Sequence, residues 1–452
     1  MDRSGRRDTI AAIATPPGAG GIGVVRISGP CVPNICETLI GALPRPRHAT
    51  LAQFSGSTGE PIDHGFALYF PAPSSFTGED VLELQGHGGF VVMEMLLQRA
   101  IELGSRIAEP GEFTERAFLN GKLDLAQAEA VADLIESTTT RSARLALRTL
   151  SGAFSELIQD LVERVIELRT FIEATLDFPD EDVDIFDQTG LLRQLPELVS
   201  TAEDILRRAH QGRLLRDGMK LVIAGAPNAG KSSLLNALSG SDAAIVMHLP
   251  GTTRDVLRER ISIDGMPIHV ADTAGLRATD DPVEREGVRR AHAEIRQADR
   301  ILWLYDAQAD PGNMAFTRSD LPPYIPVTLV RNKIDRIDED ASIRPSAAGL
   351  TEVALCAKSG AGVDLLRSHL KSSAGLGDAS DGEFIARERH VDALTRGIEH
   401  LRQANAHHRS GQPPELIAEE LRLAQQALGE ITGAFTPDDL LGRIFANFCI
   451  GK

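Results

Sequence analysis

The sequence lacks several features that would place the protein outside a reducing cytoplasm. Only four of its 452 residues are cysteines, and they form no CxxC pair, so neither a zinc site nor a disulfide framework is indicated. No apolar run approaches the roughly 18–20 residues needed to span a bilayer. The N-terminus carries basic residues but no apolar core of a signal peptide. These absences predict a cytoplasmic protein that does not enter a membrane.

An excess of positive charge is also lacking. The chain has 47 Lys+Arg against 64 Asp+Glu, a formal net charge of −17, with a pI near 5.2. Residues 122–217 and 377–452 together contain 19 basic and 31 acidic residues. Residues 218–376 contain 19 basic and 20 acidic residues. Non-specific nucleic-acid binding relies on Lys and Arg that neutralise phosphates. Any grip on nucleic acid must therefore be local or supplied by a partner.

The hydrophobic patterning changes along the chain and predicts several domains. Residues 1–121 read as mixed α/β, with short apolar runs at Thr9–Ala14, Ile22–Ile27, Phe66–Phe70 and Val81–Leu84. Residues 122–217 and 375–452 show helical periodicity. Residues 218–374 alternate strand-like runs (KLVIA, IHVAD, ILWLYD, VTLVRN) with helical ones, which is typical of a parallel sheet covered by helices. The expected fold is multidomain, with an α/β domain inserted into a helical domain.

Boundary signals place some of the helices. Asp124 and Gln127 resemble a capping box, so we expect a helix from Asp124 to about Phe178. A second helix is expected over about Leu191–Arg216, after an acidic, proline-containing interruption. The run Thr436-Pro437-Asp438-Asp439 offers an N-cap, a proline at the first helical position and early acids. A last helix should therefore start there.

The strongest functional signal is the segment Gly225–Ser232, GAPNAGKS. It matches the pattern GxxxxGKS, follows the apolar run Leu221–Ala224 and precedes a helical run, Ser233–Leu238. Backbone N–H groups in such a loop close around phosphates at a helix N-terminus, which favours anions. Lys231 would reach the β- and γ-phosphates, and Ser232 would ligate Mg²⁺.

Companion motifs follow in order. They are Gly251-Thr252-Thr253, Asp272-Thr273-Ala274-Gly275, Asn332-Lys333-Ile334-Asp335 and Cys356-Ala357-Lys358. Thr253 would supply a second Mg²⁺-binding hydroxyl, and Asp272 a carboxylate near the metal. Asp335 can accept hydrogen bonds from guanine N1–H and the exocyclic amine, which adenine does not offer. The ordered set predicts a GTPase domain of the P-loop, Ras-like kind.

The residues around the γ-phosphate leave the catalytic arrangement open. Small GTPases orient the attacking water with a glutamine just after DxxG, where this chain has Leu276. Glu284 is a candidate water-orienting residue, or else a solvated acid at a helix start. Asn228 is a candidate ligand for a monovalent cation, or else a turn-forming asparagine. Arg277 and Arg254-Asp255 either stabilise the switch loops or form surface ion pairs.

The chain as a whole resembles the tRNA-modification GTPase family (MnmE, also called TrmE). The resemblance rests on DTIAAIATPPGAGGIGVVRISG, SFTGEDVLELQGHGG, PGEFTERAFLNGKLDLAQAEAVADLI, the GTPase motifs and the terminal Cys449-Ile450-Gly451-Lys452. It implies an N-terminal domain (1–121) that dimerises and binds 5-formyl-tetrahydrofolate or methylene-tetrahydrofolate, a helical domain (122–217 and 375–452) and an inserted GTPase domain (218–374). It also implies an FAD-dependent partner, MnmG (GidA), which joins the homodimer in a heterotetramer or larger complex. The pair would install carboxymethylaminomethyl or aminomethyl groups on carbon 5 of the tRNA wobble uridine.

The resemblance also assigns residues. Folate contacts carry over onto Arg26, Glu83, Lys122 and Lys452, and Cys449 corresponds to the family's proposed reactive thiol, although a buried, inert cysteine is the alternative. Glu284 would orient the attacking water. Potassium would be held by Asn228, Met247, Leu249 and Thr252 and would supply the missing positive charge. Nucleotide contacts would extend to Ala229, Gly230, Ser233, Met247, His248, Leu249 and Pro250.

Three positions depart from the family pattern. Met247-His248 replaces a common Thr-Asp, Ala19 stands where arginine is frequent, and Cys356 replaces the usual serine of the guanine loop. If backbone carbonyls hold the potassium ion, Met247 and Leu249 can still serve. The Cys356 contact with guanine would run through backbone N–H groups. The rival hypotheses are a regulatory GTPase, in ribosome assembly or signalling, without carbon-transfer chemistry, and a folate-binding sensor without chemistry.

Overall fold

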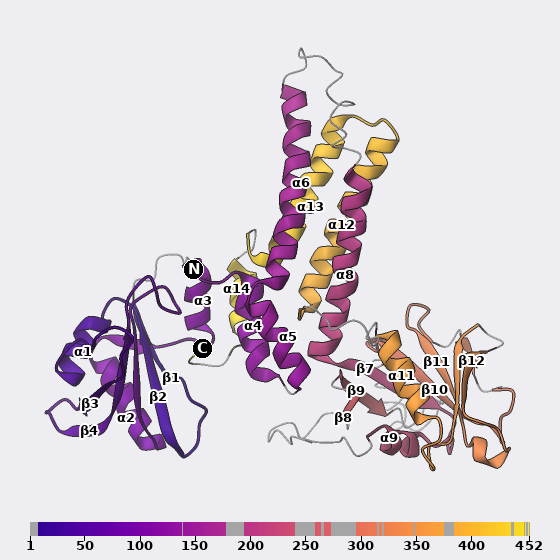
Figure 1. Cartoon of the computed structure of the whole chain (residues 1–452), viewed down its shortest axis with the longest axis horizontal. Helices are drawn as coiled ribbons and strands as arrows, with labels where there is room; N and C mark the ends of the chain where they lie inside the picture. The colour runs from indigo at the N-terminus through magenta and orange to yellow at the C-terminus, as the bar shows by residue number, and fades with distance from the viewer. Residues whose placement is uncertain are drawn as a thin grey trace, which may run out of the picture. The chain divides into compact units, whose positions relative to one another are not determined.

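The computed structural model separates the chain into two compact units. Unit 1 comprises residues 1–136, 147–202 and 393–452, and unit 2 comprises 137–146 and 203–392. The structure describes residues 8–137, 139–177, 194–239, 258–263, 266–272, 295–313, 316–318, 321–346, 349–374, 384–434, 438–446, 448 and 451. Figure 1 shows the elements of each unit. No helix in these ranges is long and apolar enough to cross a membrane.

A six-stranded sheet forms the N-terminal part of unit 1. Its order is β3-β4-β5-β2-β1-β6; β1 and β6 pair in parallel and the other neighbours are antiparallel. The strands are β1 (Thr9–Ile13), β2 (Gly20–Ser28), β3 (Thr50–Ser55), β4 (Pro61–Phe70), β5 (Val81–Gly88) and β6 (Ser105–Ile107). All four apolar runs read from the sequence lie in strands. The strands β3 and β6 were not anticipated.

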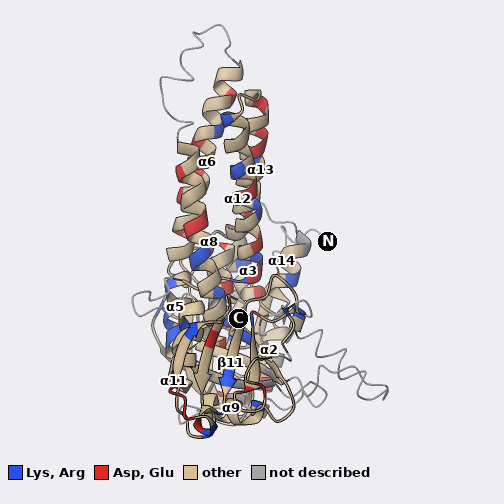
Figure 2. Ribbon diagram, turned by 90° about the vertical axis from the view of Figure 1, so that its right-hand side faces the viewer, with Lys and Arg blue, Asp and Glu red and all other residues tan. Residues whose placement is uncertain are grey.

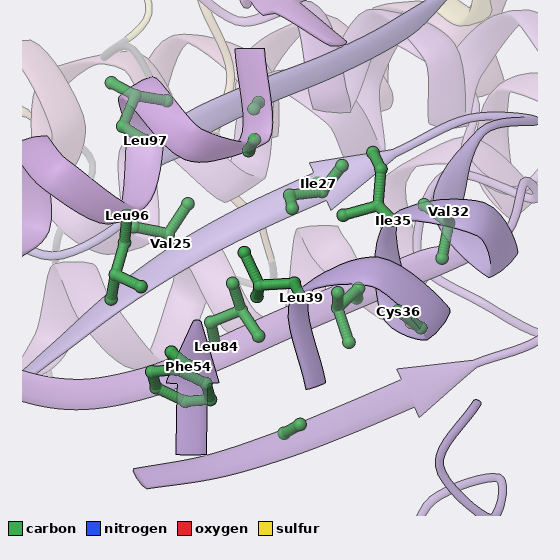
Figure 3. Close-up of a cluster of buried hydrophobic side chains, with 14 of the residues drawn as sticks. Val25, Ile27, Val32, Ile35, Cys36, Leu39, Phe54, Leu84, Leu96 and Leu97 are labelled. Carbon is green, nitrogen blue, oxygen red and sulfur yellow. The ribbon is translucent and has the colours of Figure 1, made fainter. Parts of the chain in front are cut away.

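The helices α1 (Val32–Ile40) and α2 (Phe90–Glu102) pack on this sheet. Both are amphipathic, and their apolar positions meet strand residues in one continuous core. Figure 3 shows side chains from both helices pointing toward the strands. The residues labelled there are buried: Val25, Ile27, Val32, Ile35, Cys36, Leu39, Phe54, Leu84, Leu96 and Leu97. Burying such apolar surface contributes about 25 cal/mol per Å², so this core stabilises the sheet that carries Arg26 and Glu83.

The rest of unit 1 is helical. Its helices are α3 (Glu112–Leu119), α4 (Leu125–Glu136), α6 (Ala153–Asp177), α13 (Pro414–Thr432) and α14 (Asp438–Phe445). The helices α6 and α13 pack side by side. Three further helices cross the division between the units: α5 (Thr140–Leu150), α8 (Leu195–Asp217) and α12 (Glu388–Arg409). Figure 2 shows acidic residues spread along the long helices, in keeping with their negative net charge.

The capping box at Asp124 is confirmed. The Asp124 N–H donates to Gln127 Oε1 at 3.0 Å, and the Gln127 N–H donates to Asp124 Oδ1 at 2.8 Å. The single helix expected from there to about Phe178 is wrong, because the segment forms α4, α5 and α6. Thr139 accepts the Ser142 N–H and so begins a new helix, and Gly152, with φ +100°, separates α5 from α6. The helix expected over about Leu191–Arg216 is α8, and the last expected helix is α14. The predicted cap residues of α14, Thr436 and Pro437, lie outside the described residues.

A seven-stranded sheet forms the centre of unit 2. Its order is β12-β13-β11-β10-β7-β9-β8, with five central parallel strands and an antiparallel strand at each edge. The strands are β7 (Met219–Gly225), β8 (Arg258–Ile263), β9 (Met266–Asp272), β10 (Arg300–Asp306), β11 (Val327–Asn332), β12 (Ser342–Pro345) and β13 (Thr351–Leu355). The helices α9 (Lys231–Ser239) and α11 (Val363–Ser373) pack against it. The four strand-like runs are thus confirmed as β7, β9, β10 and β11.

Candidate functional site

The phosphate loop lies between β7 and α9 in unit 2. It needs glycine at both ends, because a Cβ on Gly225 would lie 2.0 Å from the Leu304 carbonyl oxygen and one on Gly230 would lie 2.3 Å from Asn332 Nδ2. Both residues also have positive φ, at +143° and +100°. The loop therefore runs close to the neighbouring strands and opens directly onto the first turn of α9.

The side chains of this loop are arranged for an anion. The Lys231 ammonium donates to the carbonyl oxygens of Gly225 at 3.1 Å and Ala226 at 3.2 Å, so it arches back over the loop. Ser232 and Ser233 are exposed in the first turn of α9. N–H groups at a helix start, together with a cation, form a phosphate-binding environment. The arrangement fits the phosphates of a nucleotide, and Ser232 would hold Mg²⁺ there.

Asn332, at the end of β11, joins three of the motifs found in the sequence. Its Nδ2 donates to the Ala229 carbonyl oxygen at 2.8 Å, and its Oδ1 accepts the Ala357 N–H at 3.0 Å. The side chain is buried, so both hydrogen bonds are shielded from water. The phosphate loop, the NKID segment and the CAK segment are therefore brought together around one amide.

Lys333 makes a second tie to the phosphate loop. Its ammonium donates to the Asn228 carbonyl oxygen at 2.7 Å and to Asp306 Oδ2 at 2.7 Å. Burial raises the pKa of the Asp306 carboxyl, but hydrogen bonds from Lys333 and from backbone N–H groups outweigh this and hold the pKa below its usual range. Asp306 was not found by sequence reasoning, because a lone acid at a strand end carries no motif.

The NKID and CAK segments are together called the guanine loop here, and their other residues are divided between the surface and the core. Asp335 lies in the short 3₁₀ helix Ile334–Arg336 and is exposed, as is Lys358. Cys356 is buried in a small apolar cluster, and its N–H donates to the Ala361 carbonyl oxygen at 2.8 Å. Its side chain therefore faces the core, which leaves backbone N–H groups such as that of Ala357 to shape this side of the loop.

Several predicted site residues lie outside the described residues. They are Met247, His248, Leu249, Pro250, Gly251, Thr252, Thr253, Thr273, Ala274, Gly275, Glu284, Cys449 and Lys452. The backbone of Asp272 ends β9, where it pairs with Ile223 of β7. This register places it beside the strand that leads into the phosphate loop.

A second cluster of predicted residues lies in unit 1. Arg26 and Glu83 face each other across β2 and β5. Arg26 donates through Nε to Glu83 Oε1 at 3.0 Å and through Nη1 to the Gly451 carbonyl oxygen at 3.3 Å, while Nη2 lies 2.9 Å from Oε1. The chain terminus is thus brought to the middle of the N-terminal sheet.

Close packing holds the terminal segment at this place. A Cβ on Gly451 would lie 2.6 Å from the Ile13 carbonyl oxygen, and Gly451 has φ +96°. A Cβ on Gly111 would lie 2.8 Å from the Phe445 carbonyl oxygen and the same distance from Phe448 Cβ. Phe113, on α3, lies under the Arg26 guanidinium at 5.7 Å. The start of α3 therefore packs against both Arg26 and the last residues of the chain.

Lys122, the third described residue of the predicted folate set, has a different hydrogen-bond partner. Its ammonium is exposed and donates to the Pro73 carbonyl oxygen at 3.1 Å. Within the described ranges, no hydrogen bond or ion pair joins Lys122 to Arg26 or Glu83. Of the four residues assigned to folate, the structure therefore pairs Arg26 with Glu83, places Lys122 on the Pro73 carbonyl oxygen and does not describe Lys452.

A partly buried ion network around Arg116 and Glu112 of α3 lies beside the Arg26 cluster and was not anticipated. Arg116 donates to Asp8, Glu79 and Glu112 at 2.9–3.0 Å, and Arg106 donates to Asp8 and Glu112 at 2.5–2.6 Å. Burial raises the pKa of Glu112 and Asp8, but the hydrogen bonds and charges of the arginines outweigh it and hold both values below their usual range. The signal available in the sequence was the i, i+4 spacing of Glu112 and Arg116.

Comparisons with known proteins agree with this organisation. A family model described as the MnmE helical domain matches residues 125–449, and one described as the GTP-binding protein TrmE N-terminus matches residues 9–122. The chain belongs to the MnmE family of tRNA modification GTPases. The first match covers more than half of the chain, and the two together span both units.

Curated relatives match over the full length. The tRNA modification GTPase MnmE of Stutzerimonas stutzeri is 56% identical over 99% of both chains, and that of Proteus mirabilis is 52% identical over 98% of this chain and 99% of the relative. Among solved structures, the FeoB G-domain of Methanococcus jannaschii is 21% identical, with a TM-score of 0.28, over 35% of this chain and 98% of that one. The family membership confirms the resemblance, the fold class and the assignment as a GTPase in tRNA modification.

Proposed function

We propose that this chain is a potassium-dependent GTPase that modifies tRNA together with an FAD-dependent partner, MnmG (GidA). The product would be a carboxymethylaminomethyl or aminomethyl group on carbon 5 of the wobble uridine, built with a one-carbon unit from tetrahydrofolate. The observation that carries the nucleotide part is the convergence of three GTPase motifs on the Asn332 amide. A glycine-rich turn without this function would not need that arrangement.

At the nucleotide, each residue has a separate task. Asp335, exposed on its 3₁₀ turn, would accept the two guanine N–H donors, and Lys231 would grip the β- and γ-phosphates. Ser232 and Thr253 would ligate Mg²⁺. Asn228, Met247, Leu249 and Thr252 would hold potassium, and Glu284 would orient the water. When bound, Mg²⁺ offsets the negative charge that develops on the phosphates during hydrolysis.

The Arg26 and Glu83 pair fits a folate. Arg26 donates two of its five N–H groups, one to Glu83 and one to the Gly451 carbonyl oxygen, and Glu83 Oε2 receives no donor from the described residues. Guanidinium N–H groups and one carboxylate oxygen therefore remain for a ligand with both donors and acceptors, as a pterin edge and a glutamate tail have. Lys122 and Lys452 would bind the tail, and Cys449 would be the reactive thiol near the one-carbon unit.

The proposed assembly uses the three domains expected from the sequence. Residues 1–121 would form a homodimer, and the helical segments 122–217 and 375–452 would connect it to the GTPase domain, 218–374, in a heterotetramer or larger complex with MnmG.

The acidic helices are poor surfaces for RNA. An exception is α5, where Arg144 and Arg148 are exposed and no acid occurs from residue 137 to 155. We infer that tRNA contacts are limited to such basic patches and to the partner.

Nucleoside analysis tests the proposed reaction. Deleting the gene should remove the C5 substituent from wobble uridine, as measured by mass spectrometry of tRNA digests, and the intact gene should restore it. If the modification persists in the deletion strain, the rival function of a regulatory GTPase without carbon transfer is supported instead.

Salt substitution tests the proposed cofactor. Because no glutamine follows the DxxG motif, GTP hydrolysis at equal ionic strength should be much faster in potassium chloride than in sodium chloride. Glu284→Ala should keep GTP binding and lose turnover. Equal rates in both salts would contradict the potassium assignment, and unchanged turnover would return Glu284 to the role of a solvated acid.

A further inference from the structure

Asp306 occupies a position in unit 2 that none of the nucleotide-binding motifs explains. It is the last residue of β10, beside Asn332 at the end of β11. Its Oδ1 accepts the N–H groups of Gln308 at 2.9 Å and Ala309 at 3.2 Å, which closes the turn after the strand. Its Oδ2 points to the Lys333 ammonium at 2.7 Å. One oxygen therefore shapes the turn, and the other faces the guanine loop.

Lys333 needs this carboxylate more than an exposed lysine would. Its side chain is 23% exposed and its backbone lies in the left-handed region, with φ +65°. A lysine in that conformation is strained, and a partly buried ammonium is costly unless it is paired. The Asn228 carbonyl oxygen supplies one neutral acceptor at 2.7 Å. Asp306 supplies the opposite charge that keeps the ammonium at this place.

The two ties between the guanine loop and the phosphate loop differ in kind. The Asn332 tie to Ala229 is a neutral, buried hydrogen bond that needs no third residue. The Lys333 tie to Asn228 is charged and partly exposed, so without Asp306 the ammonium would gain more by returning to water. Asn228 itself has φ +62°, so the carbonyl that Lys333 binds belongs to a residue in a sparsely populated conformation.

We propose that Asp306 is a positioning residue for guanine-nucleotide binding. Its carboxylate fixes the Lys333 ammonium on the Asn228 carbonyl oxygen and so fastens the guanine loop to the phosphate loop before the nucleotide arrives. The proposal rests on the nucleotide site proposed above. Its consequence is that the nucleotide need not organise these two loops when it binds, which lowers the cost of binding.

A double-mutant cycle tests the proposal in the full-length chain, with fluorescently labelled GDP as the probe. Asp306→Asn keeps an Oδ1 acceptor for the turn and removes the charge facing Lys333. We expect the labelled GDP to bind about tenfold more weakly and to dissociate correspondingly faster, which corresponds to about 1.4 kcal/mol. Lys333→Met should weaken binding by at least as much. The double variant should bind labelled GDP with an affinity within about twofold of that of Lys333→Met, because Asp306 acts through Lys333.

Matched variants separate positioning from general stability. Asp340→Asn removes an exposed carboxylate from the same unit and should leave GDP affinity unchanged. If Asp306→Asn fails to fold, Asp306→Ser replaces it, since a hydroxyl still closes the turn. A GDP affinity of Asp306→Asn within twofold of wild type would overturn the proposal. The proposal would also fail if Asp306→Asn weakened GDP binding as much in the Lys333→Met background as in the wild-type chain. A wild-type chain that does not prefer GTP over ATP would instead contradict the proposed nucleotide site.

Discussion

The nucleotide site in unit 2 and the Arg26 cluster in unit 1 are built by different means. The nucleotide site is made of short contiguous motifs at the ends of β7, β10 and β11, and much of it is backbone held by glycines and one buried amide. The Arg26 cluster joins side chains and a terminal segment that are up to 425 positions apart in the sequence. Ion pairs of Arg116 with Asp8 and Glu79 join the supporting helix α3 to other parts of this domain.

The difference suggests how each region responds to change. A backbone site tolerates altered side chains as long as its glycines remain, as Cys356 illustrates by turning its thiol into the core. A charge network depends on complete pairing, because removing one member leaves the others buried without compensation. The following predictions test this contrast, beginning with the largest expected effect.

Arg116→Gln should destabilise unit 1 strongly. The substitution removes the arginine partner of Glu79 and leaves Asp8 and Glu112 paired with Arg106 alone, so we expect a loss of about 3–5 kcal/mol of unfolding free energy. Urea unfolding followed by circular dichroism reports on the whole chain, and the fluorescence of Trp303, the single tryptophan, reports on unit 2. The variant should lose stability in the first signal only. Arg99→Gln, which removes a pair with partly exposed Glu102, should cost less than about 1 kcal/mol; similar losses in both variants would contradict the account.

Gly230→Ala should abolish nucleotide binding without unfolding the N-terminal sheet. The new methyl group would meet Asn332 Nδ2, the atom that ties the guanine loop to Ala229, and would also strain a positive φ. We expect GDP affinity to fall at least about 100-fold, or about 2.7 kcal/mol, by titration with labelled GDP. Gly349→Ala is the matched control, since its φ of +72° is also positive but nothing lies within 4 Å of the added Cβ. Equal losses in the two variants would assign the effect to strain alone.

Gly451→Ala should impair the unit 1 site and spare the nucleotide site. The added methyl group would clash with the Ile13 carbonyl oxygen and displace the carbonyl that Arg26 binds. We expect a loss of wobble-uridine modification in complemented cells, with GDP affinity within about twofold of wild type. A fully modified tRNA pool in this strain would show that the terminal segment need not dock on Arg26.

Acid should weaken unit 1 through the same network, with a smaller effect. Glu112 and Asp8 have folded-state pKa values below the ordinary values of 4.5 and 3.8, so their contribution to stability is complete above those ordinary values. It is lost as the pH falls through the folded values. Urea midpoints followed by circular dichroism should therefore decrease as the pH falls from about 5 to about 3. In Arg116→Gln the decrease should be shallower; an equal slope would exclude the network as its cause.

Sequence reasoning predicted the parts of the fold that repeat a local rule. The parallel strands of unit 2, the phosphate loop and the capping box at Asp124 each depend on residues close in the chain, so the sequence contains their signals. The strands β3 and β6 and the Asp306–Lys333 pair depend on tertiary contacts. The breaks of the long helix at Thr139 and Gly152 have local signals, but the helical periodicity continues across them. Arg26 and Glu83 were assigned only through the family resemblance, because no local pattern shows that strand pairing places them side by side. Glu284 and Cys449 stay predictions.

The central claim is that both regions serve one reaction on tRNA. The most direct test replaces the chromosomal gene by Arg26→Ala or by Lys231→Ala and measures C5-modified wobble uridine by mass spectrometry of tRNA digests, with purified proteins assayed for GTP hydrolysis. The account predicts that both strains lose the modification, while only Lys231→Ala loses GTP hydrolysis. Normal modification in the Arg26→Ala strain, with the variant present at wild-type level, would contradict it.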